Sequence, residues 1–364
     1  MSFLSLFLVV IGLFSFPGFQ TKLVQSFTYD LKKRTGQEVV IEKVSFKWNG
    51  RLKFSNFLIL DHHNDTLLFV KDLSTSIEDF RKLKNNDYNF DRIETSTVIL
   101  NIKKYPQEFS NSLNVFLNKL KKPSNEKRAT FFKSSGITFS KSRFQYIDLN
   151  KAKGNTVKIK DIELYAENFK YQLDSFDVDL KMLKGVIEST ESKPFEFTGK
   201  VNYSPGTLIL PFFDIVNDKT HVKGSMSIKG KNNSFKNFND NVKIALSIDN
   251  STLDANALFP NKIKNLYKKP YKISLTASGS LNNLSFKKVL LQNEILFFNG
   301  DLNFKHFFEE QETNWFAIID DLRLSSKAFE DLETLSNSKK QILKNLGLLQ
   351  MSGKLSSQGD SLSM

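Results

Sequence analysis

Hydrophobic and polar residues alternate along most of this chain with the period of two that is typical of β-strands. The alternation begins near residue 37 and is sustained from residue 136, as where Ile244, Leu246 and Ile248 are separated by Ala245 and Ser247. It predicts about fifteen to eighteen strands, in a sheet with one apolar and one hydrated face. Helices do not alternate regularly with these strands, which argues against a nucleotide-binding α/β fold.

A few short segments instead show the spacing of apolar residues that is typical of helices. Residues 20–36 predict an amphipathic helix that ends at Gly36, a residue suited to the left-handed conformation after a helix. Short helices are also predicted at 109–120 and within 328–349. The basic segment 119–133 is expected to be a solvated linker.

Short polar or glycine-containing segments mark the turns between strands. Asn49-Gly50 is a strong hairpin signal because both positions of its turn need positive φ. Residues 61–65, with the sequence DHHND, predict a turn in which Asp and Asn side chains bond the backbone. Pro205-Gly206 and Asn299-Gly300 are expected to be further turns.

Residues 1–19 form a strongly apolar segment at the N-terminus. A membrane-spanning helix needs roughly 20 apolar residues, so this segment is short, and no Lys or Arg precedes it. We interpret it as an uncleaved membrane anchor. A cleaved signal peptide is the alternative, although no small-x-small cleavage site follows cleanly. The anchor residues are Phe3, Leu4, Leu6, Phe7, Leu8, Val9, Val10, Ile11, Leu13, Phe14 and Phe16.

Behind this segment the chain carries an ordered set of residues, namely Thr35, Gly36, Val39, Ile41, Val44, Trp48, Gly50 and the run from Asp61 to Leu67. Their order resembles the N-terminal region of TamB-like proteins of the AsmA superfamily, in the form found in Bacteroidota-type envelopes. The resemblance implies an anchor at 1–19, an amphipathic helix at 20–36 and a curled, antiparallel-rich β-groove domain at 37–364. It also implies that the large C-terminal part of such proteins is missing from this chain.

The apolar face of such a sheet must be covered. A second sheet would give a sandwich core and closure would give a barrel, and alternation alone does not separate these from an open groove. The resemblance implies the open groove, with phospholipid acyl chains as its occupants, and the 35 phenylalanines suit such a lining. The residues expected to line it are Phe176, Val178, Leu180, Phe195, Phe197, Val222, Met226, Ile228, Val242, Ile244, Leu246, Ile273, Leu275, Phe298 and Phe304.

The resemblance further implies a single-pass protein of the inner membrane with most of its chain in the periplasm. Its expected function is transfer of phospholipid between the inner and outer membranes during cell-envelope biogenesis. The alternative is a translocation and assembly factor for outer-membrane or secreted β-barrel proteins, acting through exposed strand edges. In that role the partner would be an outer-membrane β-barrel of the Omp85 type.

The composition gives little sign of catalysis. The chain has no cysteine, which excludes disulfides and thiolate metal sites. His62 and His63 are interpreted as part of a turn rather than as metal ligands, and no phosphate loop, nucleophile elbow or zinc-protease motif occurs. We therefore expect no enzyme, cofactor or metal. The net charge of +13 suits anionic headgroups or a lysine-rich genome, and no nucleic-acid-binding motif accompanies it.

Overall fold

The computed structural model describes most of the chain from residue 28 onward. The described residues are 28–29, 32–33, 35–46, 51–76, 78, 87–120, 131–150, 156–172, 175–188, 193–254, 270–306, 314–329, 341–342, 345, 347–358 and 361–363. The predicted anchor at 1–19 lies outside them. The chain divides into two units, residues 1–202 and 203–364, and each is described by itself.

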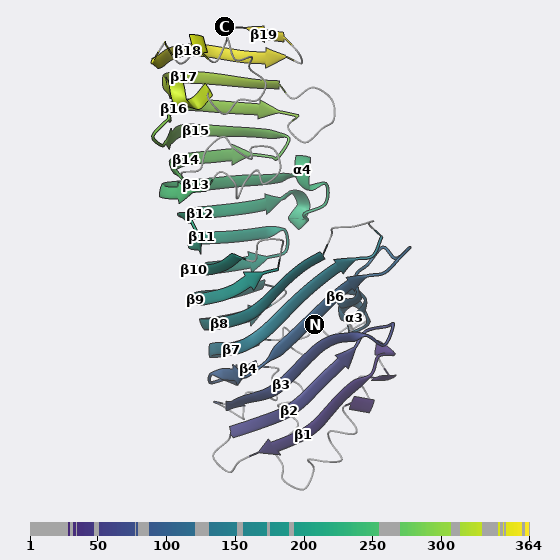
Figure 1. Ribbon diagram of the computed structural model, residues 1–364. Coiled ribbons are helices and arrows are strands. Elements are labelled where there is room, and N and C mark those ends of the chain that lie inside the picture. Colours follow the sequence, from purple (N-terminus) through teal and green to yellow (C-terminus); the bar gives the residue numbers. More distant parts are fainter. Residues whose placement is uncertain are drawn as a thin grey trace. The chain divides into compact units, whose positions relative to one another are not determined.

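The described part of the chain is mostly β, as the sequence predicts (Figure 1). The strands of the first unit are β1 (Val39–Phe46), β2 (Arg51–Leu60), β3 (Thr66–Ser76), β4 (Asp87–Phe90), β5 (Ile93–Thr95), β6 (Val98–Lys104), β7 (Phe131–Asp148), β8 (Thr156–Gln172), β9 (Ser175–Ile187) and β10 (Lys193–Ser204), which ends just past the boundary. Those of the second unit are β11 (Thr207–Asn217), β12 (Thr220–Gly230), β13 (Val242–Leu253), β14 (Tyr271–Gly279), β15 (Asn283–Gln292), β16 (Leu296–Lys305), β17 (Asn314–Ser325), β18 (Leu348–Gln358) and β19 (Ser361–Ser363). The short helices are α3 (Ser112–Leu120), α4 (Phe238–Asn241), η2 (Lys231–Asn233) and η3 (Ser326–Phe329).

The first unit joins antiparallel hairpins through a short parallel region. β1, β2 and β3 pair antiparallel in sequence order, and β7, β8 and β9 do the same. Between these sets, β5 and β6 pair antiparallel with β3, whereas β4, β5 and β6 run parallel to β7. The sheet is therefore antiparallel-rich, as predicted, with one parallel region, in which β4, β5 and β6 all pair with β7.

The first unit has a closed hydrophobic core. Helix α3 contributes Phe116, whose side chain is fully buried, and packs Leu113 and Leu117 against the same cluster. A row of phenylalanine rings extends the cluster over neighbouring strands. Phe132 lies 5.4 Å from both Phe90 and Phe169, measured between ring centroids. The buried residues of the cluster are Val39, Ile41, Leu52, Phe54, Phe57, Ile59, Leu67, Leu68, Val70, Leu73, Phe90, Ile93, Phe116, Phe132 and Tyr171.

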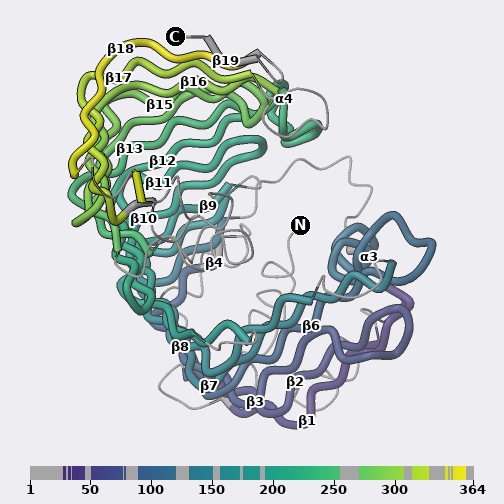
Figure 2. The backbone as a smooth tube through the Cα atoms, turned by 45° about the horizontal axis from the view of Figure 1, so that its top comes forward, coloured from purple at the N-terminus to yellow at the C-terminus, as the bar shows by residue number. Residues whose placement is uncertain are grey.

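The second unit is a plain antiparallel succession of strands. Each strand from β11 to β18 pairs with the next one in the sequence, and β19 pairs only with the end of β18. Figure 2 shows that these strands bend along their length rather than running straight. The predicted turn at Pro205-Gly206 opens the unit, and Gly206 has a φ of 68°.

The bends coincide with irregularities in strand pairing. Every pair from β11–β12 to β17–β18 contains a register shift within its length. An extra residue in one strand of a pair makes a β-bulge, which bends that strand and increases its twist. Asn250 and Lys288 occupy such positions with positive φ, at 39° and 52°. The shifts therefore explain the bending of the strands in this unit.

At some of these bulges a backbone N–H that has left the ladder donates instead to a side chain on the neighbouring strand. The N–H of Lys223 donates to Oγ of Ser251 at 2.9 Å, and that of Asn250 donates to Oγ of Ser274 at 3.0 Å. Because unpaired buried amides are costly, these short polar side chains stabilise the irregular pairing.

The structure corrects several local predictions. Asn299-Gly300 is not a turn but lies inside β16, at the register shift with β17. Residues 348 and 349 begin β18, so the predicted final helix does not extend to them. The helix predicted at 109–120 is confirmed from Ser112 onward. Residues 28–29, 32–33 and 35 are helical and Gly36 has a φ of 64°, while the remainder of the amphipathic helix predicted at 20–36 lies outside the described residues.

Candidate functional site

An unbroken row of paired apolar residues crosses the second unit from strand to strand. Paired residues of antiparallel strands project from the same face of a sheet. Met226 pairs with both Leu210 and Leu246, and the row continues to the edge of the unit. We call this row the apolar ladder, and its members are Leu210, Met226, Leu246, Ala277, Phe286, Leu302, Ala317 and Leu355.

Further apolar rows flank the ladder on the same face. Ile228 and Ile244 form a pair two residues from the ladder positions on β12 and β13, and Leu284 pairs with Phe304 in the corresponding positions of β15 and β16. Beyond the bulges a second apolar row consists of Ile273, Leu291, Phe298, Leu322 and Met351. One face of this unit is therefore hydrophobic on both sides of its bend.

This apolar face is not closed as completely as the core of the first unit. The largest fully buried side chains among the described residues all belong to the first unit. In the ladder, by contrast, Met226, Leu246, Phe286 and Leu302 are only half-buried. Such large apolar side chains leave area that an apolar ligand can cover.

Most of the residues predicted to line a groove fall on this face. Val222, Met226 and Ile228 lie on β12. On the neighbouring strand β13, Leu246 pairs with Met226 and Ile244 pairs with Ile228. The remaining predicted residues of this unit share the same face, namely Val242, Ile273, Leu275, Phe298 and Phe304. Val242 is fully buried, so it belongs to the packed edge of the face rather than to its open part.

The predicted residues of the first unit have more mixed surroundings. Phe176 lies 6.4 Å from Phe169 between ring centroids and packs against the buried cluster, so it supports the core. Val178 is buried and Leu180 is half-buried on β9. Phe195 and Phe197 are half-buried on β10. These positions contribute to packing within the first unit as well as to its apolar face.

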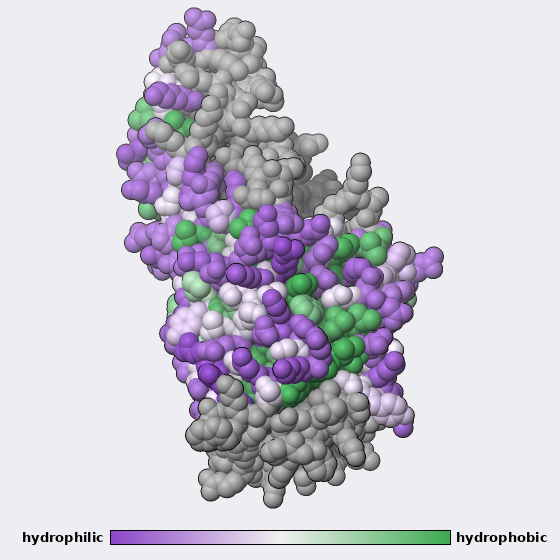
Figure 3. Space-filling view, turned by 60° about the horizontal axis from the view of Figure 1, so that its bottom comes forward, coloured by the Kyte–Doolittle hydropathy of each residue, from purple (hydrophilic) through white to green (hydrophobic). Residues whose placement is uncertain are grey.

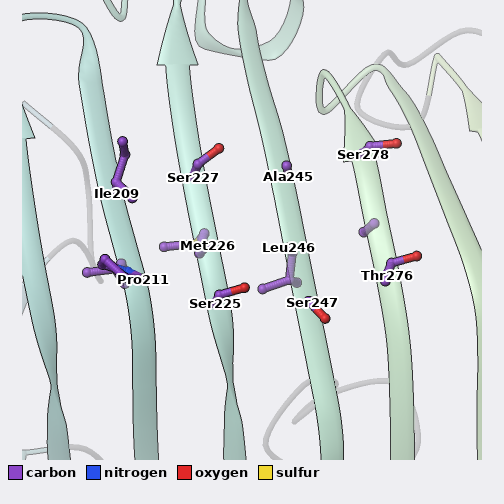
Figure 4. Close-up of a pocket in the computed structure, with 12 residues that line it drawn as sticks. Ile209, Pro211, Ser225, Met226, Ser227, Ala245, Leu246, Ser247, Thr276 and Ser278 are labelled. Atoms are coloured by element: carbon purple, nitrogen blue, oxygen red, sulfur yellow. The ribbon is translucent and has the colours of Figure 1, made fainter.

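The opposite face of the second unit carries small polar residues. A shallow hollow of about 520 Å³ lies over β11 to β14. Figure 4 shows the hydroxyl groups of Ser225, Ser227, Thr276 and Ser278 around it. Because neighbouring residues of a strand point to opposite faces, Met226 projects away from these hydroxyls. On β12 to β14 these hydroxyl groups and the ladder residues therefore lie on opposite faces, as the alternation predicts, although Ile209, Pro211 and Ala245 also line the hollow.

A second polar cluster surrounds the DHHND turn between β2 and β3. Oδ1 of Asp61 accepts hydrogen bonds from the backbone N–H groups of His63 and Asp65, each at 2.9 Å. This confirms the predicted turn, in which a side chain bonds the backbone. The hydroxyl of Tyr105 donates to carboxylate oxygens of both Asp61 and Asp65 at 2.7 and 2.8 Å, and Lys103 forms an ion pair of 2.7 Å with Asp65.

The groups in this cluster shift the pKa values of Asp65 and Tyr105. Hydrogen bonds from Lys103 and then Tyr105 lower the pKa of the Asp65 carboxyl. Burial, followed by the hydrogen bonds to the two carboxylates, raises the pKa of Tyr105 above its usual range. Tyr105 therefore keeps its proton and acts as a fixed donor to Asp61 and Asp65.

The two histidines of the turn converge on one carboxylate. Nε2 of His62 and Nε2 of His63 each lie 2.8 Å from a different oxygen of Glu108. Hydrogen bonds from His63 and then His62 lower the pKa of Glu108. Nothing in the sequence indicates this partner, because Glu108 lies 45 or more residues away in a loop before α3 and matches no spacing rule.

Comparison with known proteins does not assign the chain to a family: no protein-family model matches it, and no curated protein matches it. Among the described residues, no helix combines the length and the apolar character needed to cross a bilayer. Among the residues coloured by hydropathy in Figure 3, most are hydrophilic, and the hydrophobic ones gather in patches between them.

Proposed function

We propose that this chain is a membrane-anchored protein of the cell envelope whose apolar sheet face holds phospholipid acyl chains during their transfer between the inner and outer membranes. The observation that carries the proposal is the apolar ladder of the second unit, an unbroken row from Leu210 to Leu355 in which Met226, Leu246, Phe286 and Leu302 are only half-buried. The proposal agrees with the TamB-like order of residues behind an apolar N-terminal segment.

The dimensions of the ladder suit an acyl chain. Neighbouring strands lie about 4.8 Å apart, so the ladder extends over roughly 34 Å from β11 to β18. The hydrocarbon core of a bilayer is about 30 Å thick, and each of its two leaflets therefore holds acyl chains about 15 Å long. A chain lying along the ladder would cover several strands and leave others free for its next position.

The energetics favour movement along such a surface. Burying one methylene group is worth about 0.8 kcal/mol, so an acyl chain leaving water gains several kcal/mol. Each rung of the ladder offers an apolar residue, from alanine to phenylalanine, so a shift by one strand exchanges one set of apolar contacts for another. Transfer along the ladder then needs no chemical step, cofactor or catalytic residue.

Site-specific photocrosslinking tests this proposal directly. A photoreactive phenylalanine analogue replaces Leu246 in the ladder or, as the matched control, its neighbour Ala245, which is exposed on the opposite face. After irradiation of cells that make the full chain, we expect phospholipid adducts at position 246 and few at position 245. Absence of lipid adducts at 246, or equal yields at both positions, would contradict the proposal.

Exposed leucines at the start of β18 favour a second function, assembly of outer-membrane β-barrel proteins. Within the described strands, β18 pairs with β17 along its length, but on its other side it pairs with β19 only from Ser356 to Gln358. Leu348 and Leu349 are exposed at the start of this edge. Open edges bind other strands by backbone hydrogen bonding, which is the interaction that such an assembly role requires.

Introducing charged residues at this edge would distinguish the two proposed functions. Replacing Leu348 and Leu349 by lysine should hinder strand addition while leaving the apolar ladder unchanged. If assembly is the function, the amount of folded outer-membrane β-barrel protein falls in cells with this variant. If lipid transfer is the function, lipid crosslinking at position 246 persists in the same variant. If the variant leaves β-barrel assembly unaffected, the edge has no such role.

A further inference from the structure

The Nε2 atoms of His62 and His63 and the carboxylate of Glu108 meet at one point beside the β2–β3 turn. The three ligand atoms all lie within 4.8 Å of one another. Adjacent residues of a straight strand would point to opposite faces, so only the turn conformation lets both imidazoles face the same carboxylate. This arrangement serves neither the apolar ladder nor the strand edge, and the following inference is independent of the proposed function.

The hydrogen bonds that shape the turn do not involve its histidine side chains. Asp61 organises the backbone of the turn, and Tyr105 and Lys103 fix the carboxylates of Asp61 and Asp65. The imidazoles take no part in these hydrogen bonds. The bonds that shape the turn therefore do not explain why both imidazoles face Glu108.

Neighbouring groups hold both rings in position. The ring of Tyr105 stacks on His63 at 3.7 Å between centroids, and it meets His62 edge-on at 5.4 Å. His62 is 17% exposed at its side chain, and its buried Nδ1 has no hydrogen-bond partner among the described residues. Nε2, which lies 2.8 Å from Glu108, is therefore the ring nitrogen through which His62 makes its polar contact. Glu108 and His63 are 30% and 44% exposed at their side chains, which leaves an approach from solvent.

We propose that His62, His63 and Glu108 bind a divalent transition-metal cation of the zinc class. Two imidazole nitrogens and one carboxylate oxygen form a ligand set that Zn²⁺ accepts, whereas Ca²⁺ and Mg²⁺ prefer sites made of oxygen alone. A tetrahedral zinc site with bonds of about 2.0–2.2 Å keeps its ligand atoms about 3.4 Å apart. The observed cluster needs only small side-chain shifts to reach that spacing, and a water molecule takes the fourth position.

A bound cation would join two separate parts of the first unit. His62 and His63 belong to the turn after β2, whereas Glu108 belongs to the loop between β6 and α3 (Figure 1). A ligand that binds only the folded state stabilises that state. The inferred role of the metal is therefore to hold the turn against the loop that leads into α3.

Zinc titration of the purified full chain tests the site. The protein is first stripped with a chelator and then titrated with Zn²⁺ in competition with a chromogenic chelator at neutral pH. We expect one tight site per chain, and at least about 100-fold weaker binding for His62→Gln, His63→Gln and Glu108→Gln, since even outer partners of a metal ligand are worth about 10–100-fold in affinity. His221→Gln is the matched control, because His221 lies 2.8 Å from Asp214 but has no second histidine beside that carboxylate among the described residues.

Two results would overturn the inference. One is substoichiometric Zn²⁺ binding by the wild-type chain, and the other is unchanged affinity in the three ligand variants. The visible spectrum of Co²⁺ provides a measurement that needs no variant. Intense d–d bands are expected from a four-coordinate site with nitrogen ligands, and weak bands like those of hydrated Co²⁺ would also overturn the inference.

Discussion

The backbone N–H of Lys288 donates a hydrogen bond of 2.9 Å to the carboxylate of Asp301 on the neighbouring strand. Lys288 has a φ of 52° and lies where the register of the β15–β16 pair shifts. The bulge removes this amide from the ladder of backbone hydrogen bonds, and Asp301 supplies the missing acceptor. Asp301 also accepts from Nζ of Lys287 at 2.9 Å, so it holds both residues of the bulge.

Removal of this acceptor should destabilise the second unit. Asp301→Ala leaves the Lys288 amide without its partner, and we expect the free energy of unfolding to fall by about 1–3 kcal/mol. Asp301→Asn is the matched control, because its side-chain oxygen can still accept from the amide, and it should lose less. Urea unfolding followed by circular dichroism measures both variants. Equal stability of the alanine and wild-type proteins would show that the bulge does not depend on Asp301.

The same carboxylate should give the second unit a pH-dependent stability. The hydrogen bond from Lys287 and, after it, the backbone N–H of Lys288 lower the pKa of Asp301 in the folded state. The unfolded state then binds the proton more readily, so stability rises with pH in this range. We expect the stability difference between wild type and Asp301→Asn to be full above about pH 4 and to disappear as the pH falls below it. A difference that is constant with pH would contradict the ionic contribution.

Glycine at a bend should be hard to replace. Gly224 lies at the register shift between β12 and β13, and a Cβ atom there would be 2.0 Å from the backbone oxygen of Ser247. Gly224→Ala therefore forces the two strands apart, and we expect a loss of at least about 1–3 kcal/mol in unfolding free energy. The adjacent Ser225→Ala should change stability by less than about 0.5 kcal/mol. Chemical denaturation of both variants provides the comparison, and equal stabilities would mean that the strands can adjust at this point.

The sequence predicts the strands well because alternation reports which face of a sheet is buried. Residues on β12 and β13 such as Met226 and Leu246 lie on one face, as expected. The positions of the bulges could not be predicted from this pattern. An inserted residue moves the side chains that follow it to the other face of the sheet, and nothing in the composition marks where this happens. Met182 shows this: it follows Leu180, the partner of Ala166, with the strand period, yet the register shift pairs it with Tyr165 rather than Leu164 and puts it on the other face.

The polar cluster shows a different limit of sequence reasoning. The turn at residues 61–65 could be predicted from local chemistry, and Asp61 forms the expected hydrogen bonds to the backbone. Glu108 could not be predicted as the partner of His62 and His63, since the contact depends on how the loop after β6 packs against the turn. The parallel pairing of β6 with β7 likewise depends on long-range packing rather than on local pattern.

Truncation of a buried residue on α3 should weaken the core of the first unit. The side chain of Phe116 is fully buried within the hydrophobic cluster, and replacing a buried phenylalanine by alanine costs about 3–5 kcal/mol. We expect Phe116→Ala to lower the free energy of unfolding by that amount. Asn118→Ala, at an exposed position of the same helix, is the control and should have little effect. A small loss for Phe116→Ala would mean that α3 is not an essential cover of this core.

A charge on the apolar face should prevent lipid binding. Ile244 is half-buried beside the apolar ladder, and its neighbour Ala245 is exposed on the opposite face. Under the proposed function, Ile244→Asp places a carboxylate where acyl chains lie, and burying an unpaired charge costs several kcal/mol. Since each 1.4 kcal/mol changes binding about tenfold, we expect lipid copurification to fall roughly tenfold or more. Ala245→Asp, which adds the same charge to the same strand, should keep the wild-type lipid content. Mass spectrometry of extracted lipids measures both variants, with circular dichroism to verify that each is folded. A folded Ile244→Asp protein that still carries wild-type amounts of phospholipid would show that acyl chains do not lie on this face.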